Sequence, residues 1–256
     1  MGLKALVLTG YGINCERESQ YAIEKSGGKA SIEHLNTLMD NPQMLHDYNM
    51  LMVPGGFSFG DDIGSGKVFA NKMRFRLREP LDNFVKAGKL VLGICNGFQV
   101  LVKMGLLPNP DFNQTVSLVG NDSGHFEDRW IILKANKSSP CVFTKGIEFM
   151  LLPVRHGEGK FVASDPVLES LKQKNQIVFQ YVDDDMKMAG YPWNPNGSEG
   201  NIAGICDSTG RIFGMMPHPE AFNIPENCPY WVRGSVKEAM GLKVFRNAVE
   251  YANSKF

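Results

Sequence analysis

The first 107 residues alternate short apolar runs with longer segments in which apolar positions recur at helical spacing. Apolar runs bounded by turn residues predict strands, and the longer periodic segments predict helices. We expect strands at 4–9, 30–35, 48–56 and 89–95, and helices at 16–28, about 68–86 and 96–108. This alternation is typical of βαβ units around a parallel sheet.

The pattern changes after residue 112. Short alternating runs such as 129–135 and 147–154 follow one another without long helices, which predicts antiparallel strands. Beyond them we expect a helix at 166–175, strands at 176–182, 201–207 and 211–217, and a closing helix over 231–254. The predicted fold is α/β: a flavodoxin-like doubly wound sheet, mainly parallel, with an antiparallel excursion in the middle of the chain. Residues 1–256 are expected to form a single domain.

Composition narrows the class of function. The 27 Lys and Arg residues balance the 27 Asp and Glu residues, and no long basic block appears, which argues against nucleic-acid and membrane-surface partners. No apolar run approaches the roughly 18 residues of a membrane span. The N-terminal stretch is too short and too strand-like for a signal peptide, so we expect a cytoplasmic protein. Five cysteines without a CxxC pair favour neither a disulfide framework nor a zinc site, and no metal is expected.

The stretch "GICNG" (93–97) has the form of a strand-to-helix elbow around a nucleophile. A sharp turn there would lift Cys95 off the carboxyl edge of the sheet, and the following helix N-terminus would favour its thiolate. The alternative is a small buried thiol that fits a tight turn. The elbow alone does not decide between them.

The stretch "HPE" (218–220) supplies the groups that a thiolate needs. Pro219 favours extended backbone at the residue before it, so His218 and Glu220 are expected to point to the same side. Glu220 could then orient His218 as general base and acid for Cys95. Taken alone, "HPE" also fits an ordinary loop histidine.

A glycine pair, Gly55 and Gly56, follows the third predicted strand. Its backbone N–H groups would lie at the same sheet edge as Cys95, where a tetrahedral oxyanion needs donors. A phosphate-binding loop is the rival interpretation, but two carboxylates, Asp61 and Asp62, follow where that loop requires Lys-Ser/Thr. Gln99 lies one helical turn beyond Cys95, and its carboxamide could pair with a ligand amide.

These residues together resemble the class I (triad) glutamine amidotransferases. Further stretches resemble one branch of that family, the glutaminase subunits of phosphoribosylformylglycinamidine synthase. The similarity covers nearly the whole chain up to Glu220, and it rests on "GINCERE" (12–18), "PGGFSFGDDIGSGK" (54–67), "GICNGFQVLVKMGLLP" (93–108), "RHGEGKF" (155–161), "YPWNPNGSEGNIAGICD" (191–207) and "GMMPHPE" (214–220).

The resemblance implies roles by position. Cys95 is the expected nucleophile, with His218 and Glu220 as its partners. The backbone at Gly56 and Asn96 is expected to form the oxyanion hole. Glutamine contacts are expected from Gln99, Gly55 and His156, while Asn194 to Ser198 would line the site or face a partner. The remaining cysteines, 15, 141, 206 and 228, are expected to be ordinary thiols.

The resemblance also implies a reaction and partners. Glutamine would be hydrolysed to glutamate and ammonia, and the ammonia would pass to a separate ATP-dependent synthetase subunit that converts formylglycinamide ribonucleotide to formylglycinamidine ribonucleotide. A small third subunit usually bridges the two. No cofactor is expected on this chain, with ATP and Mg on the synthetase. Tyr11, His125 and the length of 221–242 depart from the family pattern.

Three alternatives stay open at this point. One is a flavodoxin-like redox sensor whose elbow cysteine is oxidised reversibly. Another is a relative that docks on a partner without turnover, and intact Cys95, His218 and Glu220 argue against it. The third is a triad amidotransferase that serves a different synthetase, which "FSFGDD" and "NPNGS" disfavour.

Overall fold

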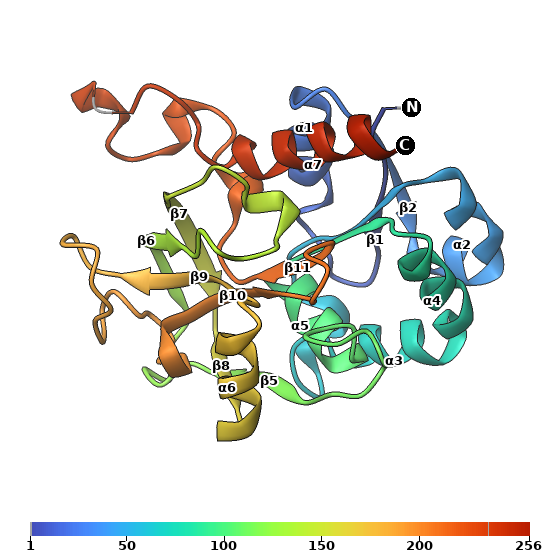
Figure 1. The fold of residues 1–256 in the computed structure, drawn as a ribbon, viewed down its shortest axis with the longest axis horizontal. Coiled ribbons are helices and arrows are strands. Elements are labelled where there is room, and N and C mark those ends of the chain that lie inside the picture. Colours follow the sequence, from blue (N-terminus) through green and yellow to red (C-terminus); the bar gives the residue numbers. More distant parts are fainter. Residues whose placement is uncertain (1, 235) are drawn as a thin grey trace.

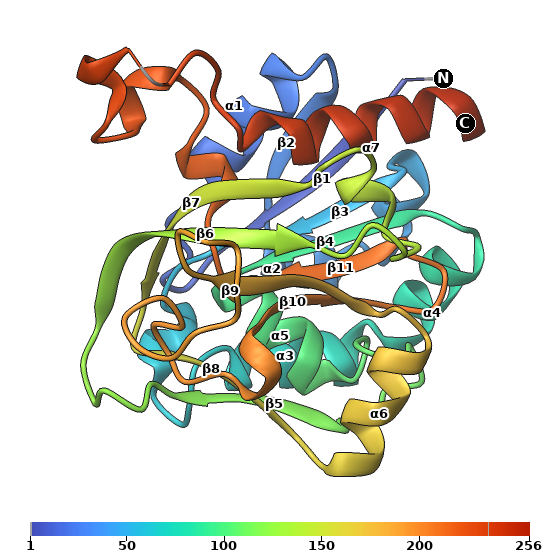
Figure 2. The same ribbon diagram turned by 60° about the vertical axis from the view of Figure 1, so that its left-hand side comes forward.

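A computed structural model describes residues 2–234 and 236–256. Within them, nine strands form one sheet in the order β2-β1-β3-β4-β11-β10-β9-β6-β7, while β5 and β8 pair separately (Figures 1 and 2). The strand bounds are β1 Lys4–Thr9, β2 Lys29–His34, β3 Met50–Val53, β4 Leu90–Ile94, β5 Val116–Gly120, β6 Glu127–Ala135, β7 Phe149–His156, β8 Glu158–Ala163, β9 Ile177–Val182, β10 Ile202–Cys206 and β11 Ile212–Met215.

Helices cover both faces of this sheet. The pair α1 and α7 lies over one face and α3, α4 and α5 lie under the other (Figure 2). The helix bounds are α1 Glu16–Lys25, α2 Leu35–Asp40, α3 Lys67–Arg76, α4 Arg78–Lys86, α5 Asn96–Met104, α6 Asp165–Gln173 and α7 Leu242–Lys255. No helix in the described ranges is long and apolar enough to cross a membrane.

The sheet has a parallel half and an antiparallel half. β2, β1, β3, β4 and β11 run parallel to one another. β10, β9, β6 and β7 pair antiparallel. The predicted fold class is confirmed, and the antiparallel part continues past the middle of the chain to β10. The last strand, β11, inserts beside β4 and so brings residues 212–218 to the strand that leads into Cys95.

Two helix predictions are wrong in their extent. The helix expected over about 68–86 is two helices, α3 and α4, separated at Leu77 (φ −124°, ψ 12°). Pro80 explains the break, because its ring would clash with the Arg76 carbonyl in a continuous helix and it has no N–H to donate. The closing helix begins at Leu242 rather than near residue 231, since Gly234 adopts a left-handed φ of 67° that ends a short 3₁₀ turn.

Candidate active site

Cys95 occupies a strained elbow between β4 and α5. Its φ of 51° and ψ of −107° are unusual for a residue with a side chain, and its N–H donates to the Met215 carbonyl at 2.8 Å. The turn needs the flanking glycine: a Cβ at Gly97 would lie 1.8 Å from the Val53 carbonyl oxygen. The sulfur is buried and lies 3.7 Å from the Arg155 carbonyl oxygen on β7. The thiol is therefore fixed at the carboxyl edge of the parallel strands.

His218 and Glu220 form a buried pair directly beyond β11. His218 Nδ1 lies 2.6 Å from Glu220 Oε1, and the His218 N–H donates to the Pro153 carbonyl at 2.9 Å. Burial alone would lower the pKa of His218, but the negative charges of Glu220 and Cys95 outweigh it and hold this pKa well above its usual value. His218 Nε2 is buried and has no hydrogen-bond partner among the described residues. The imidazole is thus oriented by one carboxylate with its other nitrogen free for proton transfer.

Cys15 is a member of this cluster that sequence reasoning missed. Its sulfur, a ring nitrogen of His218 and a carboxylate oxygen of Glu220 lie within 4.8 Å of one another. Burial raises the pKa of the Cys15 thiol, while its hydrogen bond to His218 acts in the opposite direction. By donor type this trio could hold a soft metal ion. The available signal was the position of Cys15 in the loop that follows β1 and leads into α1, at the same sheet edge as Cys95.

The two expected oxyanion donors lie on adjacent strand ends. Gly56 (φ 148°) faces Ile13 in an isolated antiparallel bridge whose hydrogen bonds come from the N–H groups of Asn14 and Phe57, so the Gly56 N–H is not used by the bridge. Asn96 is the first residue of α5, where a backbone N–H has no acceptor within the helix. The Gly55 backbone packs closely against the His218 ring, because a Cβ at Gly55 would stand 2.8 Å from His218 Cε1.

Gln99 is buried one helical turn beyond Cys95, and both ends of its carboxamide are bound to protein groups. Its Nε2 donates to the Glu158 carbonyl, and its Oε1 accepts from Asn96 Nδ2 at 3.1 Å. Glu158 also accepts from the Ser65 N–H at 3.2 Å, and Asn96 Nδ2 reaches Asp61 Oδ1 at 3.3 Å. Gln99 therefore links α5 and β8 to the glycine-rich loop that carries Gly56.

His156 ends β7 in the peptide next to the Arg155 carbonyl that contacts Cys95. Its Nδ1 lies 3.2 Å from Asn121 Oδ1, and its Nε2 is buried without a partner among the described residues. Burial, and then the positive charge of His218, lower the pKa of His156 to about 3. This histidine is therefore neutral near pH 7.

The stretch Asn194 to Ser198 is a buried support for β8 rather than an exposed face. Asn196 Nδ2 donates to the Gly159 carbonyl at 2.8 Å, and Ser198 Oγ accepts from the Phe161 N–H at 2.9 Å. Both side chains are almost fully buried.

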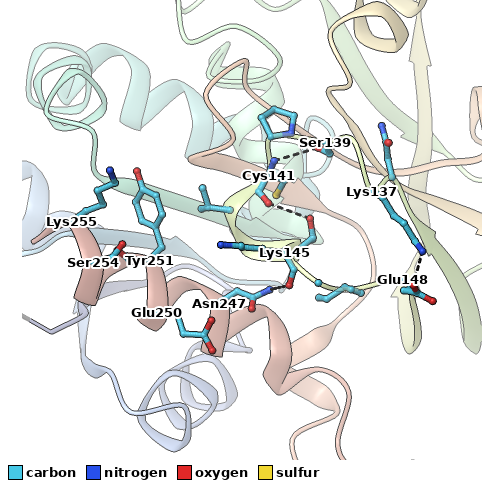
Figure 3. A pocket seen from close by; sticks show the side chains of 16 residues that line it. Lys137, Ser139, Cys141, Lys145, Glu148, Asn247, Glu250, Tyr251, Ser254 and Lys255 are labelled. Carbon is cyan, nitrogen blue, oxygen red and sulfur yellow. Dashed lines mark hydrogen bonds and ion pairs between the residues drawn. The ribbon is translucent and has the colours of Figure 1, made fainter.

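A separate hollow of about 720 Å³ lies at the opposite edge of the sheet, where Gly210 precedes β11: a Cβ at Gly210 would meet the Pro140 carbonyl of the lining. Figure 3 shows the side chains that line it. Its lining includes Cys141, Lys145 and Glu148 but no histidine. The Cys141 thiol has no imidazole there to take its proton, and burial and the neighbouring Cys206 raise its pKa well above the usual value. This hollow lacks the groups of a thiol nucleophile site.

Residues 3–252 match the family described as CobB/CobQ-like glutamine amidotransferase domain. The fold and the cysteine-imidazole-carboxylate cluster at its sheet edge agree with that match, and the chain belongs to the glutamine amidotransferases.

Curated relatives narrow the family further. Phosphoribosylformylglycinamidine synthase subunit PurQ of Methanococcus maripaludis strain S2 is 46% identical over 98% of this chain and 97% of its own length. The subunit of the same name from Dehalococcoides mccartyi is 44% identical over 98% of both chains. The chain therefore belongs to the PurQ family.

Solved structures agree with this placement. A chain of the PurLQS structure from Thermotoga maritima superposes with a TM-score of 0.71 at 33% identity, covering 98% of this chain and 99% of that one. A glutamine amidotransferase from Thermotoga maritima, at 12% identity and a TM-score of 0.56 over 98% of each chain, shares the fold.

Proposed function

We propose that this chain hydrolyses glutamine to glutamate and ammonia as the glutaminase subunit of phosphoribosylformylglycinamidine synthase. The ammonia passes to the separate ATP-dependent synthetase subunit, which aminates formylglycinamide ribonucleotide in purine biosynthesis. The observation that carries this proposal is the PurQ-family match over 98% of the chain, together with a buried imidazole-carboxylate pair beside the elbow cysteine.

The first half of the reaction follows from the geometry of the elbow. The Cys95 thiolate attacks the side-chain carbonyl carbon of glutamine, a C–S bond forms, and the carbonyl electrons move to oxygen. The N–H groups of Gly56 and Asn96 stabilise that oxyanion. Protonated His218, held by Glu220, gives its proton to the amide nitrogen, the C–N bond breaks and ammonia leaves.

The second half regenerates the enzyme. His218, now neutral, takes a proton from water as the water oxygen attacks the thioester carbon. The C–S bond breaks, and glutamate and the Cys95 thiolate are released. The proton given to ammonia and the one taken from the attacking water both move through His218, and the remaining water proton leaves the new carboxyl group to solvent. The raised pKa of His218 suits a group that is protonated when the thiolate is present.

We also propose where the protein acts and which partners and cofactors the reaction needs. Residues 1–256 act as one amidotransferase domain in the cytoplasm, without a metal or cofactor of their own, and ATP and Mg bind to the synthetase. A small bridging subunit completes the complex. Balanced charge and the absence of a basic block support a protein partner rather than a nucleic acid.

The test uses the complex with its synthetase. Cys95→Ala should lower glutamine-dependent synthesis at least about 10⁴-fold, because the nucleophile is gone. Synthesis driven by added ammonia should remain near the wild-type rate. Equal loss of both activities would contradict the division of labour. A glutamine-analogue electrophile should label Cys95, as read by mass spectrometry, and labelling confined to another cysteine would overturn the nucleophile assignment.

A further inference from the structure

The His156 side chain is a buried hydrogen-bond acceptor that the reaction scheme above leaves unused. Its protonation form is set by Asn121. The Asn121 amide group donates to the carbonyls of His125 (2.9 Å) and His156 (2.7 Å), so its Oδ1 must face His156 Nδ1. The Gly159 N–H also donates to this oxygen, at 3.0 Å. An oxygen cannot donate, so Nδ1 carries the ring proton and Nε2 carries a lone pair.

This lone pair has no partner among the described residues, and its imidazole is close enough to the catalytic pair to be influenced by the charge of His218. His156 is 3% exposed, and Nε2 is bound to no described residue. The peptide that joins Arg155 to His156 contacts Cys95 Sγ through its carbonyl oxygen, at 3.7 Å. Three residues earlier on β7, the Pro153 carbonyl accepts the His218 N–H at 2.9 Å. Buried acceptors in native proteins are normally satisfied, so an unsatisfied one at a reaction centre points to a ligand donor.

We propose that His156 Nε2 accepts a hydrogen bond from the nitrogen that leaves glutamine, first as the side-chain amide and then as ammonia. This inference rests on the proposed function. The amide nitrogen gains a proton from His218 as the C–N bond breaks, so its N–H groups become better donors in the transition state than in bound glutamine. The bond therefore promotes departure of ammonia more than it promotes glutamine binding.

The neutral imidazole suits this position for a second reason. Its pKa of about 3 prevents it from carrying a positive charge next to the protonated His218. It also prevents His156 from protonating the ammonia it holds. The synthetase needs ammonia as the free base, because ammonium has no lone pair with which to attack.

Two substitutions separate an acceptor role from a merely structural one. His156→Gln places an amide oxygen near the position of Nε2 and lacks the group that binds Asn121. His156→Asn keeps an N–H near the position of Nδ1, where it can bind Asn121, and has no atom at the position of Nε2. An acceptor role is rescued by Gln, whereas a role in holding Asn121 is rescued by Asn.

The experiment measures glutamate and aminated nucleotide in the complex with the synthetase, formylglycinamide ribonucleotide and ATP. We expect His156→Asn to lower kcat at least about tenfold with little change in KM for glutamine, as expected for one lost hydrogen bond in the transition state. It should also release more glutamate than product. We expect His156→Gln to keep most of kcat, with near-equal glutamate and product.

Several outcomes would overturn the proposal: the reverse ranking of the two variants, equal losses in both, or wild-type behaviour in both. Ammonia-driven synthesis should be unchanged in each variant, which shows that the complex is intact. If the wild-type complex fails to use glutamine at all, the proposed function itself is wrong, and that result is distinct from any ranking of the two variants.

Discussion

The two edges of the central sheet hold buried cysteines with different neighbours. At the carboxyl edge, Cys95 sits at a positive φ beside a buried imidazole-carboxylate pair. At the other edge, Cys141 and Cys206 lie beside each other, and Ser139 Oγ lies 3.5 Å from the Cys206 sulfur. Both Cys95 and Cys141 are buried. Burial therefore does not distinguish a nucleophile from a packing residue, whereas a neighbouring base does.

The edges also differ in how completely their polar groups are paired. At the carboxyl edge, buried atoms without a partner among the described residues include Asn96 Oδ1, His156 Nε2, His218 Nε2 and Glu220 Oε2. At the opposite edge, Asn247 Nδ2 donates to the carbonyls of Phe143 and Lys145, and Asp207 Oδ1 accepts from the Ile212 N–H. Unpaired buried groups are costly to fold, so their concentration around Cys95 and His218 agrees with the proposed glutamine site there.

Removing the carboxylate beside the His218 imidazole should cause the largest difference in kcat between variants at the two edges. Glu220→Gln should lower kcat for glutamine-dependent synthesis roughly 10²- to 10⁴-fold, because the amide neither stabilises the imidazolium nor orients the ring as well. Steady-state kinetics of the complex would measure the loss. Asp207→Asn at the opposite edge is the matched control and should keep kcat. Equal kcat losses in the two variants would break the comparison.

Adding one methyl group at the Cys95 elbow should lower the free energy of unfolding. Gly97→Ala places a Cβ 1.8 Å from the Val53 carbonyl, and we expect about 3–5 kcal/mol less stability in urea unfolding. Gly120→Ala is the control, since a Cβ there meets no atom within 4 Å. A stability for Gly97→Ala within about 0.5 kcal/mol of the control would show that the elbow is less tightly packed than described.

The two histidines of the site should give opposite pH slopes of stability. The pKa of folded His156 is about 3 against an ordinary 6.5, so the unfolded chain binds more protons between those values. Stability contributed by this residue therefore falls as pH drops from about 6.5 towards 3. Urea unfolding of His156→Gln should show a weaker loss on acidification than wild type. An unchanged acid slope would contradict a neutral buried imidazole.

The stability contributed by His218 changes with pH in the opposite direction, because the pKa of His218 in the folded protein is raised above 6.5. Its stabilising charge interaction with Glu220 is fully present below about pH 6.5 and is lost as pH rises through the folded pKa. The stability difference between wild type and His218→Gln should therefore shrink as the solution becomes alkaline. A difference that grows with pH would mean that this pKa is lowered instead.

The smallest effect on activity and stability is expected for a substitution of Cys141, at the opposite edge of the sheet. Cys141→Ala should cost about 1–2 kcal/mol of stability through lost packing and leave glutamine-dependent synthesis unchanged. In a timed alkylation read by mass spectrometry, Cys95 should react before Cys141, whose pKa is raised well above its usual value by burial and Cys206. Faster labelling of Cys141 would reverse the assignment of the two edges.

Much of the fold was predictable because it depends on local patterns. Continuous apolar runs with glycine and proline punctuation marked β1, β3, β4 and the elbow, where steric limits on backbone angles act within a few residues. The helix over 68–86 was predicted too long because its periodicity continues across Leu77, while Pro80 interrupts the hydrogen bonding. Periodicity reports which residues face the core and says less about where a helix breaks.

The active site likewise has features that local sequence predicts and contacts that only the folded chain creates. The chain alone determined the elbow around Cys95, a short stretch whose residue types impose its geometry. The "HPE" stretch was expected to be extended, but Pro219–Ala221 form a 3₁₀ turn, and His218 and Glu220 pair across that turn. Only the tertiary structure decided what meets there: insertion of β11 beside β4 joins residues 95 and 218, the loop between β1 and α1 adds Cys15, and Asn121 sets the ring proton of His156. These contacts depend on strand order and on side chains from distant segments, which no local spacing encodes.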